Sequence, residues 1–313
     1  MKNNLSVLLL FLCFFSSQIY GNSIVRKIND YSLSNIQSDD LRLVDSYCEV
    51  GKTYIAILID GDDNKFILKQ KMNSLFAVVF EKLVTDIAYE VDIPANLVRI
   101  ISYNFPFIGK ENKHIPATLH TFAPGIAAKD LPEHLSKYSV SLRQLLKGGS
   151  AKVAGFRRML VYRMSLHEDF PKIIALDTFI ANHDRHAGNF FYDEETDHFF
   201  AIDFEAAFRK NLAENVYKCF VSMAKDKKLL LSPEEVKSLV VYRDMLKKLV
   251  DTYNPEILYS RMDELMDKAR SDAIRKEINW DKKEWYKEMM LANYNSCNKV
   301  IDILETLIEK CRG

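Results

Sequence analysis

Three polar side chains in the middle of the chain have the types and the spacing that phosphoryl transfer requires. Asp184 is followed five positions later by Asn189, and Asp203 comes directly after an apolar run at residues 199–202. Mg²⁺ prefers oxygen ligands, usually one or two from protein and the rest from water and phosphate. Asn189 and Asp203 offer such oxygens, while Asp184 is left to accept the proton of an attacking hydroxyl. The spacing therefore predicts a site for Mg²⁺ and a nucleotide, and Mn²⁺ would suit the same ligands.

The elements predicted around these residues explain how the three side chains meet. A helical apolar pattern over residues 173–180 leads into the loop that carries Asp184. Residues 190–192 and 199–202 are then predicted as two strands, with a turn between them. Because a hairpin brings its open ends together, the side chain before the first strand and the side chain after the second can share an ion.

Two other interpretations of these residues are open. Asp184 and its neighbours could end a helix with a local salt bridge, and Asp203 could begin a solvated loop. His183, His186 and His198 suggest a zinc site instead. Zinc sites usually need three or four nitrogen or sulfur ligands with a stiff spacing, and no cysteine lies nearby. We therefore prefer the magnesium interpretation.

A hairpin in the amino-terminal third offers a cation that could reach the phosphates. Residues 53–59 and 65–71 are predicted strands, joined by the turn Asp-Gly-Asp-Asp-Asn. Alternation with a period of two places Lys69 and Lys71 on one face of the second strand. Lys69 is the first choice for contact with the phosphates and Lys71 is the second.

A carboxylate that orients this lysine is expected on the next element. Residues 75–91 have apolar side chains at helical spacing, and Pro94 stops the helix. Glu81 lies within this helix and is the first choice to pair with Lys69. Glu90 is the second choice, since sequence alone does not fix which helix face meets the strand.

The segment Asn-His-Asp-Arg-His-Ala-Gly-Asn at residues 182–189, with Ile-Asp-Phe at residues 202–204, resembles the catalytic and metal-binding loops of atypical kinases. The most similar types are the HipA-like kinases and the phosphatidylinositol 3-/4-kinase superfamily, which share a D-R-H-x-x-N…I-D-F pattern. The strongest resemblance is confined to these loops, and the rest of the chain agrees in order and pattern.

The resemblance implies a role for each matching position. Asp184 matches the catalytic aspartate, Asn189 and Asp203 match the two metal ligands, and His186 matches a histidine that assists at the transferred phosphoryl group. Glu205 is a departure, because many kinases have glycine after the Asp-Phe pair. This departure makes the start of the following segment less flexible and leaves its switching behaviour open.

In such a kinase, the strand-like segments 97–101 and 118–122 lead into the hinge between two lobes. The backbone around His120 and Phe122 would then contact the adenine edge. The loop that covers the nucleotide would lie at residues 49–52, which contain a single glycine. The chain has no G-x-x-x-x-G-K-[ST] motif, so a P-loop NTPase is not supported.

The amino terminus has the composition of a secretory signal peptide. Lys2 gives a positive start, residues 5–15 are apolar, and Gly21 is a small residue at the expected cleavage point. The apolar run is shorter than the roughly 20 residues of a membrane span. We expect cleavage, no stable membrane span afterwards, and export to a periplasm, a secretory lumen or the exterior, or delivery by a bacterium into a host cell. An uncleaved anchor is the alternative.

The charge, the cysteines and the carboxyl-terminal sequence pattern give further expectations about the chain. The chain has 43 basic and 43 acidic residues, so its charge gives no indication of nucleic-acid binding. Four cysteines remain after cleavage, and they could form two disulfides or stay as buried thiols. Ser232 and Pro233 begin a predicted helix. Further helices are predicted at about 255–278, 282–294 and 297–311.

Together these features predict an α+β, two-lobed, protein-kinase-like fold. Residues 1–21 would be the signal peptide, residues 22–122 a β-rich lobe with one helix, and residues 123–313 a larger, mostly helical lobe. The expected activity is transfer of the γ-phosphoryl group of ATP to a hydroxyl of a protein or a phosphoinositide. The alternatives are a kinase-shaped module that binds a nucleotide or a partner without transfer, and an enzyme that transfers AMP.

Overall fold

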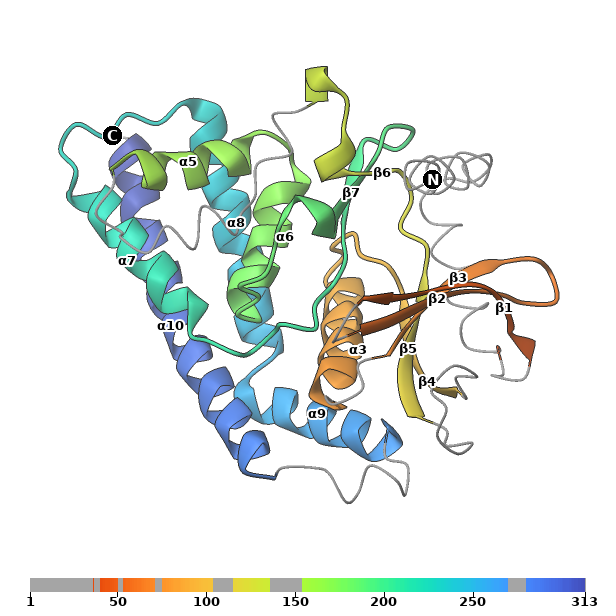
Figure 1. Cartoon of the computed structure of the whole chain (residues 1–313). Helices are drawn as coiled ribbons and strands as arrows, with labels where there is room; N and C mark the ends of the chain where they lie inside the picture. The colour runs from red at the N-terminus through yellow and green to blue at the C-terminus, as the bar shows by residue number, and fades with distance from the viewer. Residues whose placement is uncertain are drawn as a thin grey trace.

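The protein is seen here in a computed structural model that describes residues 36, 40–49, 53–70, 75–103, 115–135, 154–269 and 280–312. A β-rich lobe and a larger helical lobe lie side by side (Figure 1), so the predicted α+β, two-lobed fold is confirmed. The predicted signal peptide, Lys71 and most of the covering loop at residues 49–52 lie outside the described residues. The lobe boundary at residues 122 and 123 stays a prediction.

Five antiparallel strands form the sheet of the small lobe in the order β1-β2-β3-β5-β4. The predicted hairpin at residues 53–71 is confirmed, because β2 pairs with β3 around a tight turn. Along β3, buried side chains alternate with partly exposed ones, as expected for a strand with two different faces. The strands are β1 Arg42–Glu49, β2 Thr53–Ile59, β3 Lys65–Gln70, β4 Val98–Tyr103 and β5 Ile115–Thr121.

One helix of the small lobe, α3 (Leu75–Glu90), lies between the sheet and the large lobe (Figure 1). Most of its side chains are buried, which explains why its apolar pattern runs almost all the way around the helix. The predicted helix at residues 75–91 is thus confirmed. Because α3 lies between the sheet and the large lobe, a side chain on this helix can reach the lysine on β3.

A small sheet of the large lobe contacts the small lobe through one isolated bridge. β6 (Ile126–Ala127) pairs with β7 (Phe190–Asp193), which pairs in turn with β8 (His198–Ala201). An isolated bridge between Ala95 and Ala201 links the small lobe to the end of β8. The predicted 190–202 hairpin is therefore confirmed. The bridge to Ala95 places the end of this hairpin next to the small lobe.

The large lobe is built from helices whose buried faces share one hydrophobic core with α3. The Ser232 hydroxyl accepts from the Glu235 N–H, and the Glu235 carboxylate accepts from the Ser232 N–H, so α8 begins with a reciprocal cap, at the start expected for it. None of the helices in the described part of the chain is long and apolar enough to cross a membrane. The helices are α5 Ala154–Ser165, α6 Asp169–Phe179, α7 Leu212–Lys225, α8 Pro233–Thr252, α9 Pro255–Ala269 and α10 Trp280–Arg312.

The last helix corrects one prediction. Two helices were expected at 282–294 and 297–311, but α10 is continuous through both. Asn293, near the expected break, is fully buried and donates to the carbonyl groups of Thr178 and Phe179 at 2.8 and 2.7 Å. Its side-chain oxygen accepts the Ala213 N–H at 3.0 Å. Asn293 is therefore a buried link from α10 to α6 and α7.

The cysteines in the described residues are free thiols. Cys219 and Cys297 are buried and Cys311 is partly buried. Burial raises the pKa of Cys297, so this thiol stays protonated. These three therefore favour the buried-thiol alternative; the side chain of Cys48 lies outside the described residues.

Candidate active site

The loop that carries Asp184 is held by a buried arginine. Arg185 donates to both carboxylate oxygens of Asp177 on α6, each at 2.9 Å. Its guanidinium also donates to the carbonyl groups of Asn189, at 2.9 Å, and Ile202. Arg185 thus ties the loop to α6 and to both arms of the hairpin. Sequence reasoning noted only a local salt bridge here, because the hairpin geometry that presents these two carbonyl groups to Arg185 cannot be read from a single sequence.

The open end of the hairpin brings the two candidate metal ligands near each other. Phe190 pairs with Ala201, and the N–H of Ile202 donates to the carbonyl of Asn189 at 3.1 Å. Asn189 and Asp203 therefore flank the last backbone hydrogen bond of the hairpin. Asp203 has a φ angle of 64°, a left-handed conformation that aspartate tolerates better than most residues and that turns the chain at this point.

The side chains of the loop are oriented by short-range hydrogen bonds. Asn189 donates its amide Nδ2 to the carbonyl of Asp184 at 3.3 Å, which directs the amide oxygen Oδ1 to the other side. The Asp184 N–H donates to Asn182 at 3.2 Å. His186 accepts the N–H of Gly188 on its ring atom Nδ1 at 3.1 Å. In the neutral ring the proton is then on Nε2, so His186 can donate a hydrogen bond from that atom.

The small lobe supplies a lysine to the same place. Lys69 Nζ lies 3.6 Å from Asp203 Oδ1 and 3.9 Å from Glu81 Oε1. Glu81 also accepts the Phe204 N–H on Oε2 at 2.7 Å, so a carboxylate on α3 holds the residue that follows Asp203. The structure thus brings together Lys69, Glu81 and Asp203, which are far apart in the sequence. Glu90, the second choice, lies at the other end of α3.

Burial and charge set the protonation of this group. Burial alone would lower the pKa of Lys69, but Asp203, Glu81 and Glu205 raise it above its ordinary value. Burial raises the pKa of Glu81 to about 7, although Lys69 and the Phe204 N–H oppose this rise. Lys69 is therefore charged at neutral pH, while Glu81, its carboxylate partner on α3, titrates near neutrality.

The structure places His120 within the sheet, and its proposed contact with adenine stays a prediction. Its backbone pairs with Ile67 on one side and with Val98 on the other. Its buried ring contacts Asn96 and Thr118, each at 2.8 Å. Burial, and then Lys69, hold the pKa of His120 well below its usual range. The His120 ring is therefore neutral, and its Nδ1 lies 3.8 Å from Glu81 Oε1.

Phe122 is in a different position from His120. It comes directly after the end of β5 at Thr121, so its backbone lies outside the ladder of the sheet. Its side chain is half-buried. Among the residues proposed to contact adenine, Phe122 is the one whose placement suits the hinge.

The residues after Asp203 form a short, buried connection to α7. Phe204, Ala206, Ala207 and Phe208 are buried, and the Phe208 N–H donates to the carbonyl of Ile180 at 2.7 Å. Glu205 is half-buried and contributes to the raised pKa of Lys69. Residues 204–211, between Asp203 and the start of α7, contain no serine, threonine or tyrosine.

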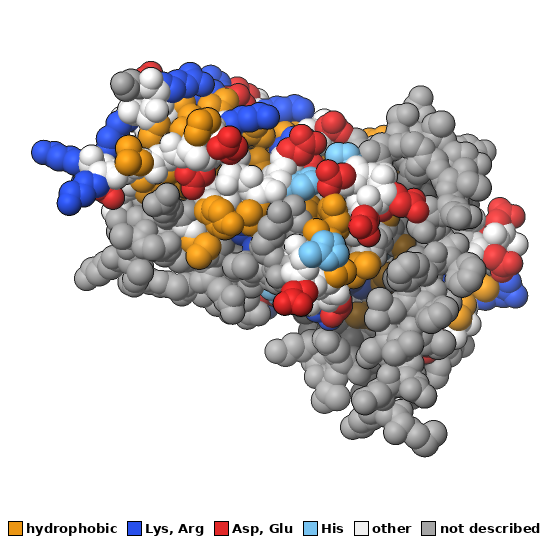
Figure 2. All heavy atoms as spheres, turned by 90° about the horizontal axis from the view of Figure 1, so that it is seen from above, with side chains coloured by type: hydrophobic (Ala, Val, Ile, Leu, Met, Phe, Trp, Pro, Cys, Tyr) orange, Lys and Arg blue, Asp and Glu red, His pale blue; other side chains and the backbone are white. Residues whose placement is uncertain are grey.

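The histidines of the zinc alternative do not gather. Histidine and acidic side chains lie close together on the face seen from above (Figure 2), and one group in the described residues has the spacing for a metal ion: Glu168, Asp169 and His198. This group includes neither His183 nor His186.

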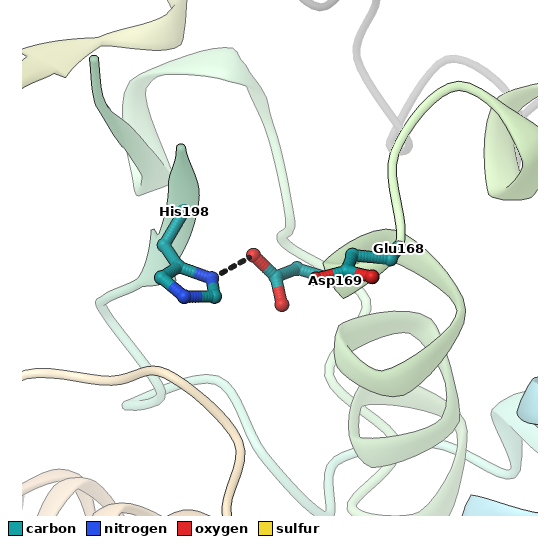
Figure 3. Close-up of side chains that lie close together, drawn as sticks. All are labelled: Glu168, Asp169 and His198. Carbon is teal, nitrogen blue, oxygen red and sulfur yellow. Dashed lines mark hydrogen bonds and ion pairs between the residues drawn. The ribbon is translucent and has the colours of Figure 1, made fainter. Parts of the chain in front are cut away.

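The Asp169 group lies away from the candidate site. Asp169 accepts from the His198 ring and from the Phe199 N–H, each at 3.0 Å, and Figure 3 shows the His198 ring facing this carboxylate. These bonds tie the first residue of α6 to β8. His198 pairs with Asp193 at the turn end of the hairpin. Asp193 is four residues from Asn189, and each residue step along a strand is about 3.4 Å. The hydrogen bonds of Asp169 therefore give this group a structural role, which is to link α6 to β8.

Comparison with known proteins gives one family match and many similar solved structures, two of which are described below. A family model described as phosphatidylinositol 3- and 4-kinase matches residues 119–218, which contain the Asp184 loop and the Asp203 hairpin. No curated protein matches the sequence. The match supports a phosphotransferase of the kinase class in general.

The solved structures share little sequence with the chain. The proinflammatory kinase CtkA of Helicobacter pylori is 11% identical, with 86% of this chain and 96% of that chain covered and a TM-score of 0.44. The aminoglycoside phosphotransferase APH(4)-Ia is 12% identical, with 87% and 99% covered and a TM-score of 0.32.

Proposed function

We propose that this protein transfers the γ-phosphoryl group of ATP, bound with Mg²⁺, to a hydroxyl group of a protein or a phosphoinositide. The observation that carries the proposal is the position of Lys69 between Glu81 and Asp203, at 3.9 and 3.6 Å. A lysine from one lobe and a carboxylate from the other are what a bound nucleotide and its metal ion need at their phosphates. The family match over residues 119–218 supports the same class of reaction.

The residues present fit a magnesium ion. Asn189 and Asp203 offer oxygen ligands on either side of the hairpin's last hydrogen bond, and Asn189 uses its nitrogen for Asp184, which leaves its oxygen for a cation. When bound, Mg²⁺ would neutralise charge on the phosphates. Lys69 would hold the phosphates, and Glu81 would orient Lys69. Asp184 would position the acceptor hydroxyl and accept its proton, and His186 would donate from Nε2 to the transferred group.

Two substitutions test these roles. Asp203→Ala removes a metal ligand, so we expect turnover with labelled ATP to fall by roughly a hundredfold to a thousandfold. Asp184→Asn keeps the shape of the loop but removes the proton acceptor, so transfer should be lost while ATP binding, measured by calorimetry, is kept. Wild-type turnover in either variant would contradict the assigned roles.

The acceptor and the alternative activities are separated by the same assay. Purified protein is incubated with labelled ATP and Mg²⁺, together with protein substrates or phosphoinositide vesicles. Label on a protein or a lipid supports a kinase, and mass spectrometry of the product distinguishes a phosphoryl group from AMP. Nucleotide binding without any transfer would support the binding-module alternative, which Glu205 at the usual glycine position favours.

A further inference from the structure

The helix α3 carries Glu81, so its position decides whether Glu81 reaches Lys69. Figure 1 shows α3 between the sheet on one side and the carboxyl-terminal helices on the other. Both ends of α3 contact residues from these helices or from the turn between α8 and α9. The contacts are of different kinds at the two ends, and neither end touches the nucleotide-binding residues named above.

At the carboxyl end, a salt bridge joins α3 to α9. Arg261 donates to both oxygens of Glu90, at 2.8 and 2.9 Å, and the Tyr253 hydroxyl donates to Glu90 at 2.6 Å. The Arg261 guanidinium lies 5.2 Å from the centre of the Tyr253 ring. Burial alone would raise the pKa of Glu90, but the bonds from Arg261 and Tyr253 lower it. Glu90 is therefore a charged anchor of α3.

The surroundings show why this salt bridge matters. A pocket of about 490 Å³ separates part of α3 from α9 and β4, so side chains do not fill this interface. Two other cations at the pocket pair within their own helices, Lys82 with Asp86 at 2.5 Å and Lys268 with Glu264 at 2.6 Å. Glu90 and Arg261, in contrast, reach across from one helix to the other.

At the amino end, aromatic packing holds α3 against α10. The Tyr286 ring lies 4.6 Å from the ring of Phe76 and 4.7 Å from that of Phe80. Phe80 also lies 5.3 Å from Phe208, in an edge-to-face contact. Phe80 directly precedes Glu81, so this packing fixes the turn of the helix that faces Lys69.

We propose that Arg261, Tyr253 and Tyr286 form a brace, the α3 brace, that holds α3 so that Glu81 meets Lys69. In this proposal Arg261 is a positioning residue, because it touches Glu90 and neither the substrate nor the nucleotide. The proposal rests on the proposed function for its activity measurement. It also makes a structural claim that can be tested without activity.

The test compares Arg261→Ala with a matched variant on the same helix, Lys268→Ala, whose lysine pairs only with Glu264 of α9 among the described residues. In Arg261→Ala we expect kcat to fall by about ten- to a hundredfold, with a smaller change in the KM for ATP, because misplacement of a catalytic group acts mainly on the transition state. Lys268→Ala should keep wild-type kcat. The exchanged pair Glu90→Arg with Arg261→Glu should recover part of the loss.

Hydrogen exchange gives the readout that is independent of activity. The Phe204 N–H donates to Glu81, so its exchange, and that of the α3 amides, should become faster in Arg261→Ala but not in Lys268→Ala. Unchanged exchange in Arg261→Ala would overturn the α3 brace whatever the activity. If exchange changes as expected while the wild-type protein transfers no phosphate to any acceptor, the brace stands and the proposed function fails.

Discussion

Lys69 lies within ion-pair distance of two carboxylates, and this surplus of negative charge determines how the site responds to pH. Glu81 is almost fully buried, so its charged form depends on the Phe204 N–H and on one lysine that Asp203 also attracts. Burial and the neighbouring carboxylates therefore raise its pKa to about 7, whereas an exposed glutamate would be ionised well below this value.

We expect phosphoryl transfer to increase as the pH rises through about 7, because Glu81 must lose its proton to pair with Lys69. The effect on stability has the opposite sign. A carboxyl group with a raised pKa in the folded state stabilises the fold below its ordinary value of 4.5, and this contribution is lost as the pH rises through about 7. The measurement is kcat/KM across the neutral range for the wild type and for Glu81→Gln. An unchanged pH profile in Glu81→Gln would assign the titration to another group.

At the scale of single elements, local patterns predicted most of what the structure shows. Alternation predicted β2 and β3, helical spacing predicted α3, and a serine followed by proline predicted the start of α8. These features depend on residues that are close in the sequence. The same holds for the 190–202 hairpin, which brings Asn189 near Asp203.

The features that sequence reasoning missed depend on how separate elements pack against each other. Arg185 binds two backbone carbonyls whose positions are set by the hairpin, and His120 is buried because β5 has strands on both sides. Asn293 links α10 to α6 and α7 through partners that are 80 to 115 positions away. A single sequence gives no signal for such contacts.

Asn293 gives a test at this scale. Asn293→Ala leaves the carbonyl groups of Thr178 and Phe179 and the N–H of Ala213 without this partner inside the core. We expect the free energy of unfolding to fall by about 2–4 kcal/mol, measured by urea denaturation. The control is Asn298→Ala on the same helix, where an exposed amide donates only to Tyr294 among the described residues, and little change is expected. Equal losses in the two variants would contradict the buried link.

At the scale of the whole molecule, the two lobes are joined at several points around the site. The Ala201 N–H donates to the carbonyl of Pro94 at 3.0 Å, and Ala95 bridges to Ala201, so the connection before β4 contacts the last residue of β8, two positions before Asp203. Gly125, between β5 and β6, has a φ angle of 85° and lies against the backbone of β7. The spacing between Lys69 and Asp203 is therefore set by contacts between lobes as well as within them.

Gly125 can be tested against a second glycine. A Cβ atom at Gly125 would lie 1.9 Å from the carbonyl oxygen of Tyr192, whereas a Cβ atom at Gly61 would meet nothing within 4 Å. We expect Gly125→Ala to lower the free energy of unfolding by more than about 2 kcal/mol, since the φ angle is also unfavourable for alanine. Thermal unfolding of Gly125→Ala and Gly61→Ala provides the comparison. Wild-type stability in Gly125→Ala would show that the backbone at Gly125 can move away from β7.

The composition of residues 204–211, between Asp203 and α7, limits how the proposed phosphotransferase could be controlled. Residues 204–211 offer no hydroxyl side chain, and the apolar side chains of this stretch are anchored in the interior. A kinase acting on this protein would find no serine, threonine or tyrosine there to modify. Activation by phosphorylation of a hydroxyl side chain would have to take place elsewhere in the chain.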